Sequence, residues 1–197
     1  MRYGAEHKQQ TRERVLKEAA KAIRLSGPHQ VGVADIMAKA GLTHGGFYAH
    51  FKSRDDLVAA AVGQMFTDSG AALALSNEDK PAAEVLNGYL DFYLSPRHRD
   101  RRDSGCPLPY LATDAPRLTQ PVREQFAAGV AGLRRMLSGQ LSRLGVMAPE
   151  PEASSMLAEM VGALTLARAE PDPTLSDAIL DISKTALKRR FKLESQL

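Results

Sequence analysis

Hydrogen-bond donors gather in one short stretch near the start of this 197-residue sequence. Five side chains between positions 43 and 52 carry a hydroxyl, an imidazole or an ammonium group: Thr43, His44, Tyr48, His50 and Lys52. Such groups donate hydrogen bonds to phosphate oxygens and can reach the edges of nucleic-acid bases. The chemistry that these residues indicate is therefore non-covalent recognition of a polyanion.

The elements that must position these donors are expected to be helices. A period near 3.6 in the apolar residues predicts helices over residues 11–25, 33–40, 44–50, 54–74, 81–94, 115–144, 152–169 and 174–192, with an irregular stretch at 95–109. Gly41 is predicted to end the second helix because glycine tolerates a left-handed C-cap, and Ser53 is placed to cap the fourth. No segment alternates like a strand, so the predicted fold class is all-α.

The second and third predicted helices, joined by a turn at Gly41, have the skeleton of a helix-turn-helix. Two stretches, Thr-Arg-Glu-Arg-Val-Leu at 11–16 and Val-Ala-Asp-Ile-Met-Ala-Lys-Ala-Gly-Leu-Thr-His-Gly-Gly-Phe-Tyr-Ala-His-Phe-Lys-Ser-Arg-Asp-Asp-Leu at 33–57, resemble the DNA-binding domain of TetR-family regulators. The similarity covers about residues 10–60. It implies a homodimeric, all-helical repressor that binds a palindromic operator in double-stranded DNA and is released by a small-molecule ligand.

The resemblance also implies roles for individual residues. It places four of them in or beside a recognition helix that faces the bases: Thr43, His44, Gly45 and Phe47. It implies phosphate contacts for Tyr48, His50 and Lys52, and a place close to the DNA backbone for Arg14. The sequence departs from the family pattern twice: Gly32 replaces a frequent threonine or serine, and Arg54 replaces the usual lysine.

Several of these residues also have a purely structural interpretation. Phe47 can pack inward instead of meeting bases, and for Phe51 packing is the expected role. Thr43 can act as an N-cap, a role compatible with DNA contact, and His50 can cap the end of the same helix. Tyr48 has a phenol to place, which favours phosphate contact over packing.

The glycine pair and the arginines of the first helix leave two interpretations open. Gly45 and Gly46 each cost about 1 kcal/mol in a helix relative to alanine. They either ease packing against the preceding helix or let the backbone approach another surface closely. Arg12 and Arg14 either lie near DNA or belong to a solvated face.

Charge is unevenly distributed along the chain. Residues 1–54 contain ten Lys and Arg against four Asp and Glu, whereas the remainder contains 16 against 19. A basic first quarter indicates a polyanion partner, with a solvated basic helix as the alternative. We accordingly predict two domains, a helix-turn-helix DNA-binding domain at 1–54 and a helical ligand-binding and dimerisation domain at 55–197.

Other classes of protein are not indicated. Cys106 is the single cysteine, which excludes an internal disulfide and a cysteine-based metal cluster. The sequence has no HExxH motif, phosphate-binding glycine loop or nucleophile–base arrangement, so we expect no enzyme, no metal and no cofactor. It has no secretory signal and no run near the roughly 18 apolar residues of a membrane span, which predicts a cytoplasmic protein without membrane association.

The last two predicted helices are apolar over a wide arc, which predicts that a second subunit covers them in a homodimer; an ordinary monomer core is the alternative. A ligand pocket needs apolar walls with a few polar groups. The candidates for its lining, each with core packing as the alternative, are Tyr89, Phe92, Tyr93, Cys106, Tyr110, Phe126 and Met160.

Cys106 has a chemistry of its own to consider. It follows the cationic run at 97–102, and nearby positive charge makes a thiolate more available. This context raises the hypothesis of a sensor of oxidants or electrophiles, but a buried, inert cysteine is the expected interpretation.

Overall fold

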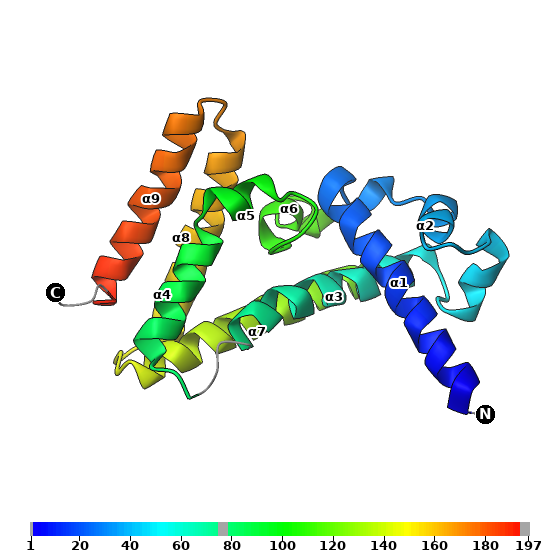
Figure 1. Ribbon diagram of the computed structural model, residues 1–197, viewed down its shortest axis with the longest axis horizontal. Coiled ribbons are helices and arrows are strands. Elements are labelled where there is room, and N and C mark those ends of the chain that lie inside the picture. Colours follow the sequence, from blue (N-terminus) through cyan, green and yellow to red (C-terminus); the bar gives the residue numbers. More distant parts are fainter. Residues whose placement is uncertain (1, 75–78, 194–197) are drawn as a thin grey trace. The chain divides into compact units, whose positions relative to one another are not determined.

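The computed structural model describes residues 2–74 and 79–193, and all regular structure in these ranges is helical (Figure 1). In chain order the elements, with η for a 3₁₀ helix, are α1 (Arg2–Ser26), η1 (Pro28–Gln30), α2 (Val33–Lys39), η2 (His44–Ala49), α3 (Arg54–Ala74), α4 (Ala82–Tyr93), α5 (Pro96–Asp100), α6 (Leu108–Leu111), η3 (Ala115–Arg117), α7 (Gln120–Arg143), α8 (Pro149–Ala169) and α9 (Pro173–Arg190). The predicted all-α fold class is confirmed.

Two predicted segments differ in detail. The third helix of the helix-turn-helix is a 3₁₀ helix, η2, rather than an α-helix. The stretch predicted to be irregular at 95–109 contains the short helices α5 and α6. Its first helix had a local signal, since the Ser95 hydroxyl accepts a hydrogen bond from the backbone N–H of His98 and Pro96 follows at the first helical position, where proline fits best.

The described chain divides into two compact units. The N-terminal unit comprises Met1–Thr67 and Cys106–Gly129, and the C-terminal unit comprises Asp68–Gly105 and Val130–Leu197. The later segment joins the N-terminal unit through contacts such as that of Phe126 with Phe66, whose ring centroids lie 5.7 Å apart. These units are divisions of packing; the functional boundary between residues 54 and 55 stays a prediction.

The N-terminal unit is built around a buried stripe of α1. Val15, Leu16, Ala19 and Ile23 are all buried, as the helical period predicts. Side chains from α2, η2 and the residues beyond it complete the same core, with Ile36, Phe47 and Phe51 each no more than 2% exposed. Burying each large side chain contributes about 1.5–3 kcal/mol, which is enough to fix short helices that would not hold alone.

The turn between α2 and η2 is the predicted glycine C-cap. Gly41 adopts a φ of +73°, a left-handed conformation that a residue with a Cβ rarely takes. Its N–H donates to Ala38 O at 2.9 Å, and the N–H of Leu42 donates to Met37 O at 2.9 Å. This pair of bonds is a Schellman motif, and it sets the direction in which η2 leaves α2.

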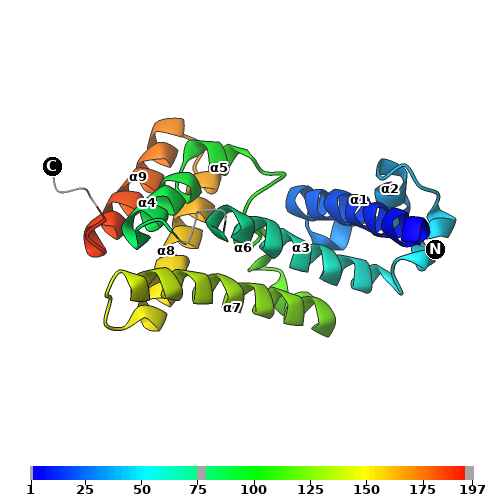
Figure 2. The ribbon, with the colours of Figure 1, turned by 60° about the horizontal axis from the view of Figure 1, so that its bottom comes forward.

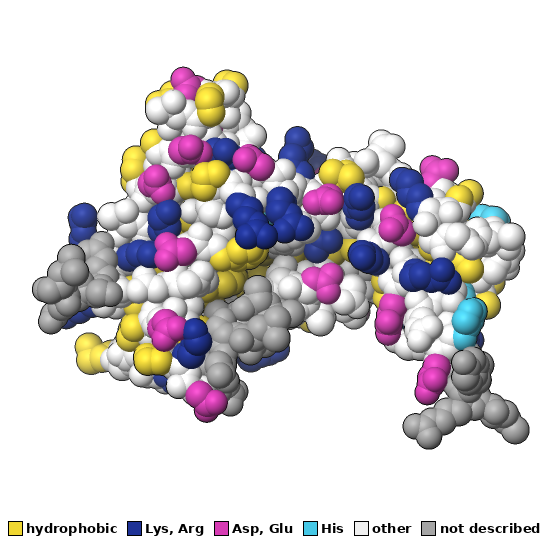
Figure 3. Space-filling model, viewed as in Figure 1, with side chains coloured by type: hydrophobic (Ala, Val, Ile, Leu, Met, Phe, Trp, Pro, Cys, Tyr) yellow, Lys and Arg dark blue, Asp and Glu magenta, His cyan; other side chains and the backbone are white. Residues whose placement is uncertain are grey.

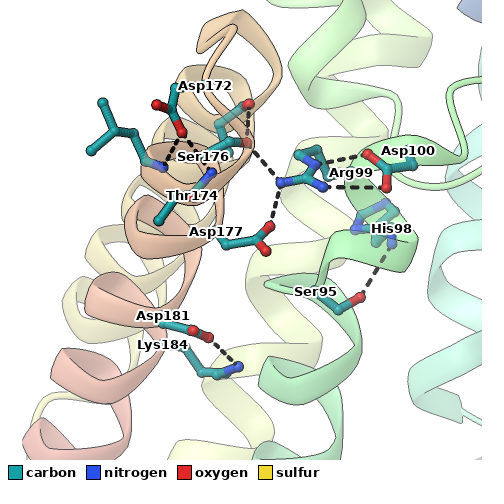
Figure 4. A network of polar contacts seen from close by, with 12 residues as sticks. Ser95, His98, Arg99, Asp100, Asp172, Thr174, Ser176, Asp177, Asp181 and Lys184 are labelled. Atoms are coloured by element: carbon teal, nitrogen blue, oxygen red, sulfur yellow. Dashed lines mark hydrogen bonds and ion pairs between the residues drawn. The ribbon is translucent and has the colours of Figure 1, made fainter.

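The C-terminal unit contains the helical hairpin of α8 and α9, with α4 alongside α9 and α5 against α8 (Figure 2). A polar network ties α5 to this hairpin (Figure 4). Arg99 donates to Ser176 Oγ at 2.8 Å and to Asp177 Oδ1 at 2.5 Å, while Arg168 donates to the backbone oxygens of His98 and Arg99. The last carbonyls of α5 are thus satisfied by a side chain of α8.

We predict that two glycines of α7 respond oppositely to alanine. A Cβ at Gly129 would overlap the ring of Phe66, so Gly129→Ala should destabilise the protein by about 1–3 kcal/mol through overpacking. A Cβ at Gly139 meets no other group within 4 Å, so Gly139→Ala should stabilise it by up to about 1 kcal/mol through helix propensity. Urea denaturation of both variants measures these changes, and equal effects would contradict the close approach of α3 to α7 at Gly129.

Candidate nucleic-acid interface

The side chains predicted to meet DNA surround η2. Thr43, His44, Gly45 and Tyr48 are exposed, and Tyr48, at 72%, is the most exposed of the phenylalanines and tyrosines whose side chains are described. Because a 3₁₀ helix repeats every three residues, Gly45 and Tyr48 project from the same side of η2. Thr43 makes no side-chain capping hydrogen bond, so its hydroxyl is not engaged in the N-cap role.

Phe47 does not lie on this exposed surface, so its predicted contact with bases is corrected. Its side chain is 2% exposed, its ring meets that of Phe51 at a centroid distance of 5.7 Å, and the two rings are nearly parallel. A ring buried in this way anchors η2 to the core and has no surface to offer a base. We therefore remove Phe47 from the base-contacting set and assign it to packing, the alternative that the sequence left open.

The two glycines of η2 differ in their surroundings. A Cβ at Gly46 would lie 3.7 Å from Met37 Cε, an ordinary packing distance, whereas a Cβ at Gly45 would meet nothing within 4 Å. Packing against α2 therefore does not explain the glycine at 45. The small exposed surface there lies between His44 and Tyr48 and is open to an outside group.

The predicted phosphate contacts lie around this exposed surface. Lys52 is exposed, and its backbone N–H donates to Asp56 Oδ2 at 2.9 Å. Asp56 in turn donates its own N–H to Ser53 Oγ at 3.1 Å, which confirms Ser53 as a cap of α3. Arg14 is also exposed on α1, where it donates to Thr11 Oγ1 at 3.4 Å.

His50 is half-buried at the end of η2. Its Nδ1 is buried and has no hydrogen-bond partner within the described residues. Burial lowers the pKa of His50 below its ordinary value, and the positive charges of Lys8 and Arg12 lower it further.

Arg54 has a role that the sequence did not reveal. Its guanidinium donates to three backbone oxygens of the segment between α1 and α2, those of Pro28 at 2.6 Å, His29 at 3.0 Å and Val31 at 3.0 Å. The planar fork of arginine can reach several acceptors at once, which a lysine ammonium cannot match. No sequence signal marks this role, because the carbonyls converge only after folding.

Lysine and arginine side chains also lie on α1. In the view of Figure 3, Lys and Arg side chains in dark blue lie over α1, with acidic side chains in magenta among them. The surface of α1 in this view is therefore mixed in charge. A preference of this surface for a polyanion must therefore come from particular basic side chains and not from the overall charge of α1.

The predicted pocket residues are divided between the two units. Tyr89, Phe92, Tyr93 and Met160 belong to the C-terminal unit, and Cys106, Tyr110 and Phe126 belong to the N-terminal unit. Phe92 is 43% exposed, whereas Tyr89, Tyr93, Met160 and Cys106 are buried. A ligand pocket lined by this set stays a prediction.

Burial also bears on Cys106. The residue is 3% exposed, and reactive thiols are usually more accessible, so the inert alternative gains support over an oxidant sensor. His98, eight residues before Cys106, is also buried, and no pattern in the sequence indicated its burial. His98 is 2% exposed, its Nδ1 lies 2.8 Å from Tyr93 O, and burial lowers the pKa of its imidazole.

The part of the chain that the structure describes has no group of three or more His, Cys, Asp or Glu side chains placed to hold a metal ion. Within residues 2–74 and 79–193, no helix is both long enough and apolar enough to cross a membrane.

Part of this chain matches a known protein family. Residues 15–61 match the family described as "Bacterial regulatory proteins, tetR family". An uncharacterised HTH-type transcriptional regulator of Lactococcus lactis subsp. lactis is 23% identical over 185 residues, which are 91% of this chain and 94% of the relative. A TetR transcriptional regulator from Chloroflexus aurantiacus has a similar structure, with a TM-score of 0.78, 25% identity and coverage of 95% and 96%.

A third similarity concerns the fold alone. The reduced form of E. coli NemR superimposes with a TM-score of 0.79 at 18% identity, over 91% of this chain and 97% of that one.

Replacing Arg54 by lysine tests its role in holding the helix-turn-helix. We expect Arg54→Lys to destabilise the protein by about 1–2 kcal/mol, because a partly exposed lysine cannot maintain three hydrogen bonds to the same carbonyls. Arg134→Lys, at an exposed position of α7, should change stability by less than about 0.5 kcal/mol. Guanidinium denaturation gives both values, and equal small changes would remove Arg54 from this role.

Proposed function

Since this chain is a DNA-binding transcriptional regulator of the TetR family, we propose that it is a repressor. It occupies a palindromic operator as a homodimer and leaves it when a small-molecule ligand binds. The observation that carries this proposal is the exposed surface of η2, where hydrogen-bond donors flank Gly45 on a helix anchored by buried phenylalanines.

The proposed contacts divide by chemistry. Thr43 and His44 donate to base edges, and the open surface at Gly45 lets the bases approach. Phosphate contacts, which fix the register on DNA without reading sequence, are proposed for Tyr48, His50, Lys52 and Arg14. With Phe47 buried, few side chains read bases, so we expect a short specific half-site with tolerated positions around it.

The homodimer is supported by the apolar surface of the α8–α9 hairpin. Leu166 on α8 is 62% exposed, and on α9 Leu175 and Ile182 are 55% and 69% exposed. Apolar groups on both helices of one hairpin are the pattern that a second copy of the same hairpin covers. Such a dimer presents two recognition elements, and a palindrome with half-sites about 34–36 Å apart, or a multiple of that distance, fits it.

The ligand is proposed to be a small molecule with apolar surface and at least one hydrogen-bonding group. Tyr89 and Tyr93, whose ring centroids lie 5.8 Å apart in the C-terminal unit, are the kind of lining that offers both. We propose a cytoplasmic site of action, where the operator is. A turnover assay against a panel of metabolites tests the alternative of an enzyme.

Operator recognition is tested by selection from random DNA. We expect an inverted-repeat consensus, and the absence of any consensus would favour a non-specific, architectural DNA-binding protein. On the selected site, Lys52→Ala should weaken binding to all sequences alike and make the slope of log K against log salt shallower by about 0.9. Lys80→Ala, in the C-terminal unit, is the control and should leave that slope unchanged.

The proposed dimer surface makes a separate prediction. Ile182→Asp buries a charge in the interface, so the variant should be monomeric in sedimentation and should lose operator affinity by at least about tenfold. Met147→Asp is the matched control, because Met147 is fully exposed but lies between α7 and α8. If Ile182→Asp remains dimeric while circular dichroism shows an intact fold, another surface forms the dimer.

A further inference from the structure

We propose that α1 contributes a phosphate-binding site of its own, formed by Lys8 and Arg12 together with His50 of η2's C-terminal end. This inference rests on the proposed operator binding and adds contacts to it. Lys8 and Arg12 precede residues 15–61, the stretch that matches the family.

The geometry brings α1 to the end of the recognition element. The guanidinium carbon of Arg12 lies 4.9 Å from the centroid of the Phe51 ring, a cation–π distance. Phe51 is buried and follows His50 directly, and the centroids of these two rings are 6.4 Å apart. The core side chain Phe51 therefore holds Arg12 in place beside His50.

Lys8 lies about one helical turn before Arg12 on α1. The positive charges of Lys8 and Arg12 both act on His50, where they oppose protonation of the imidazole and lower its pKa. Lys8 and Arg12 are four residues apart on α1, so they lie on the same face of the helix. Three nitrogen-bearing side chains thus converge from two elements of the N-terminal unit.

The convergence lacks a compensating anion. Among the described residues, neither Lys8 nor Arg12 forms an ion pair, and the neighbouring Glu13 accepts a hydrogen bond from Gln9. Arg54 and Arg99, by contrast, are both held by carbonyls or carboxylates. Uncompensated cations that repel one another are stabilised by an anion arriving between them.

The chemistry of the site favours a phosphodiester of the operator. Because Nδ1 of His50 is buried, Nε2 is the ring nitrogen left to meet an outside oxygen. The site belongs to the same unit as the exposed residues Tyr48 and Lys52, which flank His50 in the sequence. A free phosphate has the same chemistry, so the experiment must separate the two sources.

The salt dependence of operator binding tests the site. We expect Lys8→Gln and Arg12→Gln each to make the slope of log K against log salt shallower by about 0.9, since each lost phosphate contact releases one counterion fewer. Fluorescence anisotropy on the selected operator measures the slope. Arg12→Lys should largely restore it, which separates loss of charge from loss of packing on Phe51.

Lys21→Gln is the matched control. Lys21 is exposed on the same helix but lies nine residues beyond Arg12, about half a turn round, so its slope should equal that of the wild type. Unchanged slopes in Lys8→Gln and Arg12→Gln, with a wild type that selects an inverted repeat, would overturn this site and leave the proposed function standing. A wild type that selects no sequence contradicts the proposed function itself.

Titration with inorganic phosphate separates the two sources of the anion. In NMR spectra we expect the operator duplex to shift the His50 ring proton resonance to a limiting value. We expect millimolar phosphate to produce only a small part of that shift. Saturation by phosphate alone, with operator affinity unchanged in Lys8→Gln and Arg12→Gln, would assign the site to a free anion and overturn its assignment to DNA.

Discussion

The stacked, buried rings of Phe47 and Phe51 are the contact on which the recognition surface depends. They tie η2 and the residues after it to the core of the N-terminal unit, so a short 3₁₀ helix that has little stability alone holds one orientation. Everything that η2 presents to an outside partner follows from that orientation, since Gly45 and Tyr48 face outward because Phe47 faces inward. The same buried ring of Phe51 supports the guanidinium of Arg12 on α1.

A second set of contacts fixes the framework around η2. The Schellman turn at Gly41 sets its beginning, and the Ser53 and Asp56 caps define where α3 begins. Arg54, the first residue of α3, binds three carbonyls of the segment before α2. These bonds join the first turn of α3 to the segment that precedes α2.

In the C-terminal unit, the short helix α5 is held in place mainly by polar contacts. This helix buries little surface of its own. Arg99 bonds it to α9 (Figure 4), and Arg168 of α8 donates to its carbonyls. His98 of α5 is buried, and its pKa is lowered because desolvation disfavours the charged form of its imidazole. The apolar surface of the hairpin itself remains open at Leu166 and Ile182, as expected of a face that a second subunit covers.

Local patterns in the sequence located the long helices, although α1 begins at Arg2 rather than at residue 11 and the short helices α5 and α6 were not predicted. Helical periodicity located the long helices, Gly41 and Ser53 marked the caps, and the motif around residues 33–57 identified the class of DNA-binding domain, because each of these signals is a property of neighbouring residues. Tertiary structure alone decided which aromatic side chains face inward, that η2 is a 3₁₀ helix, and that Arg54 binds a distant segment. Those outcomes depend on groups far apart in the chain competing for the same space and the same hydrogen bonds, and no local pattern records that competition.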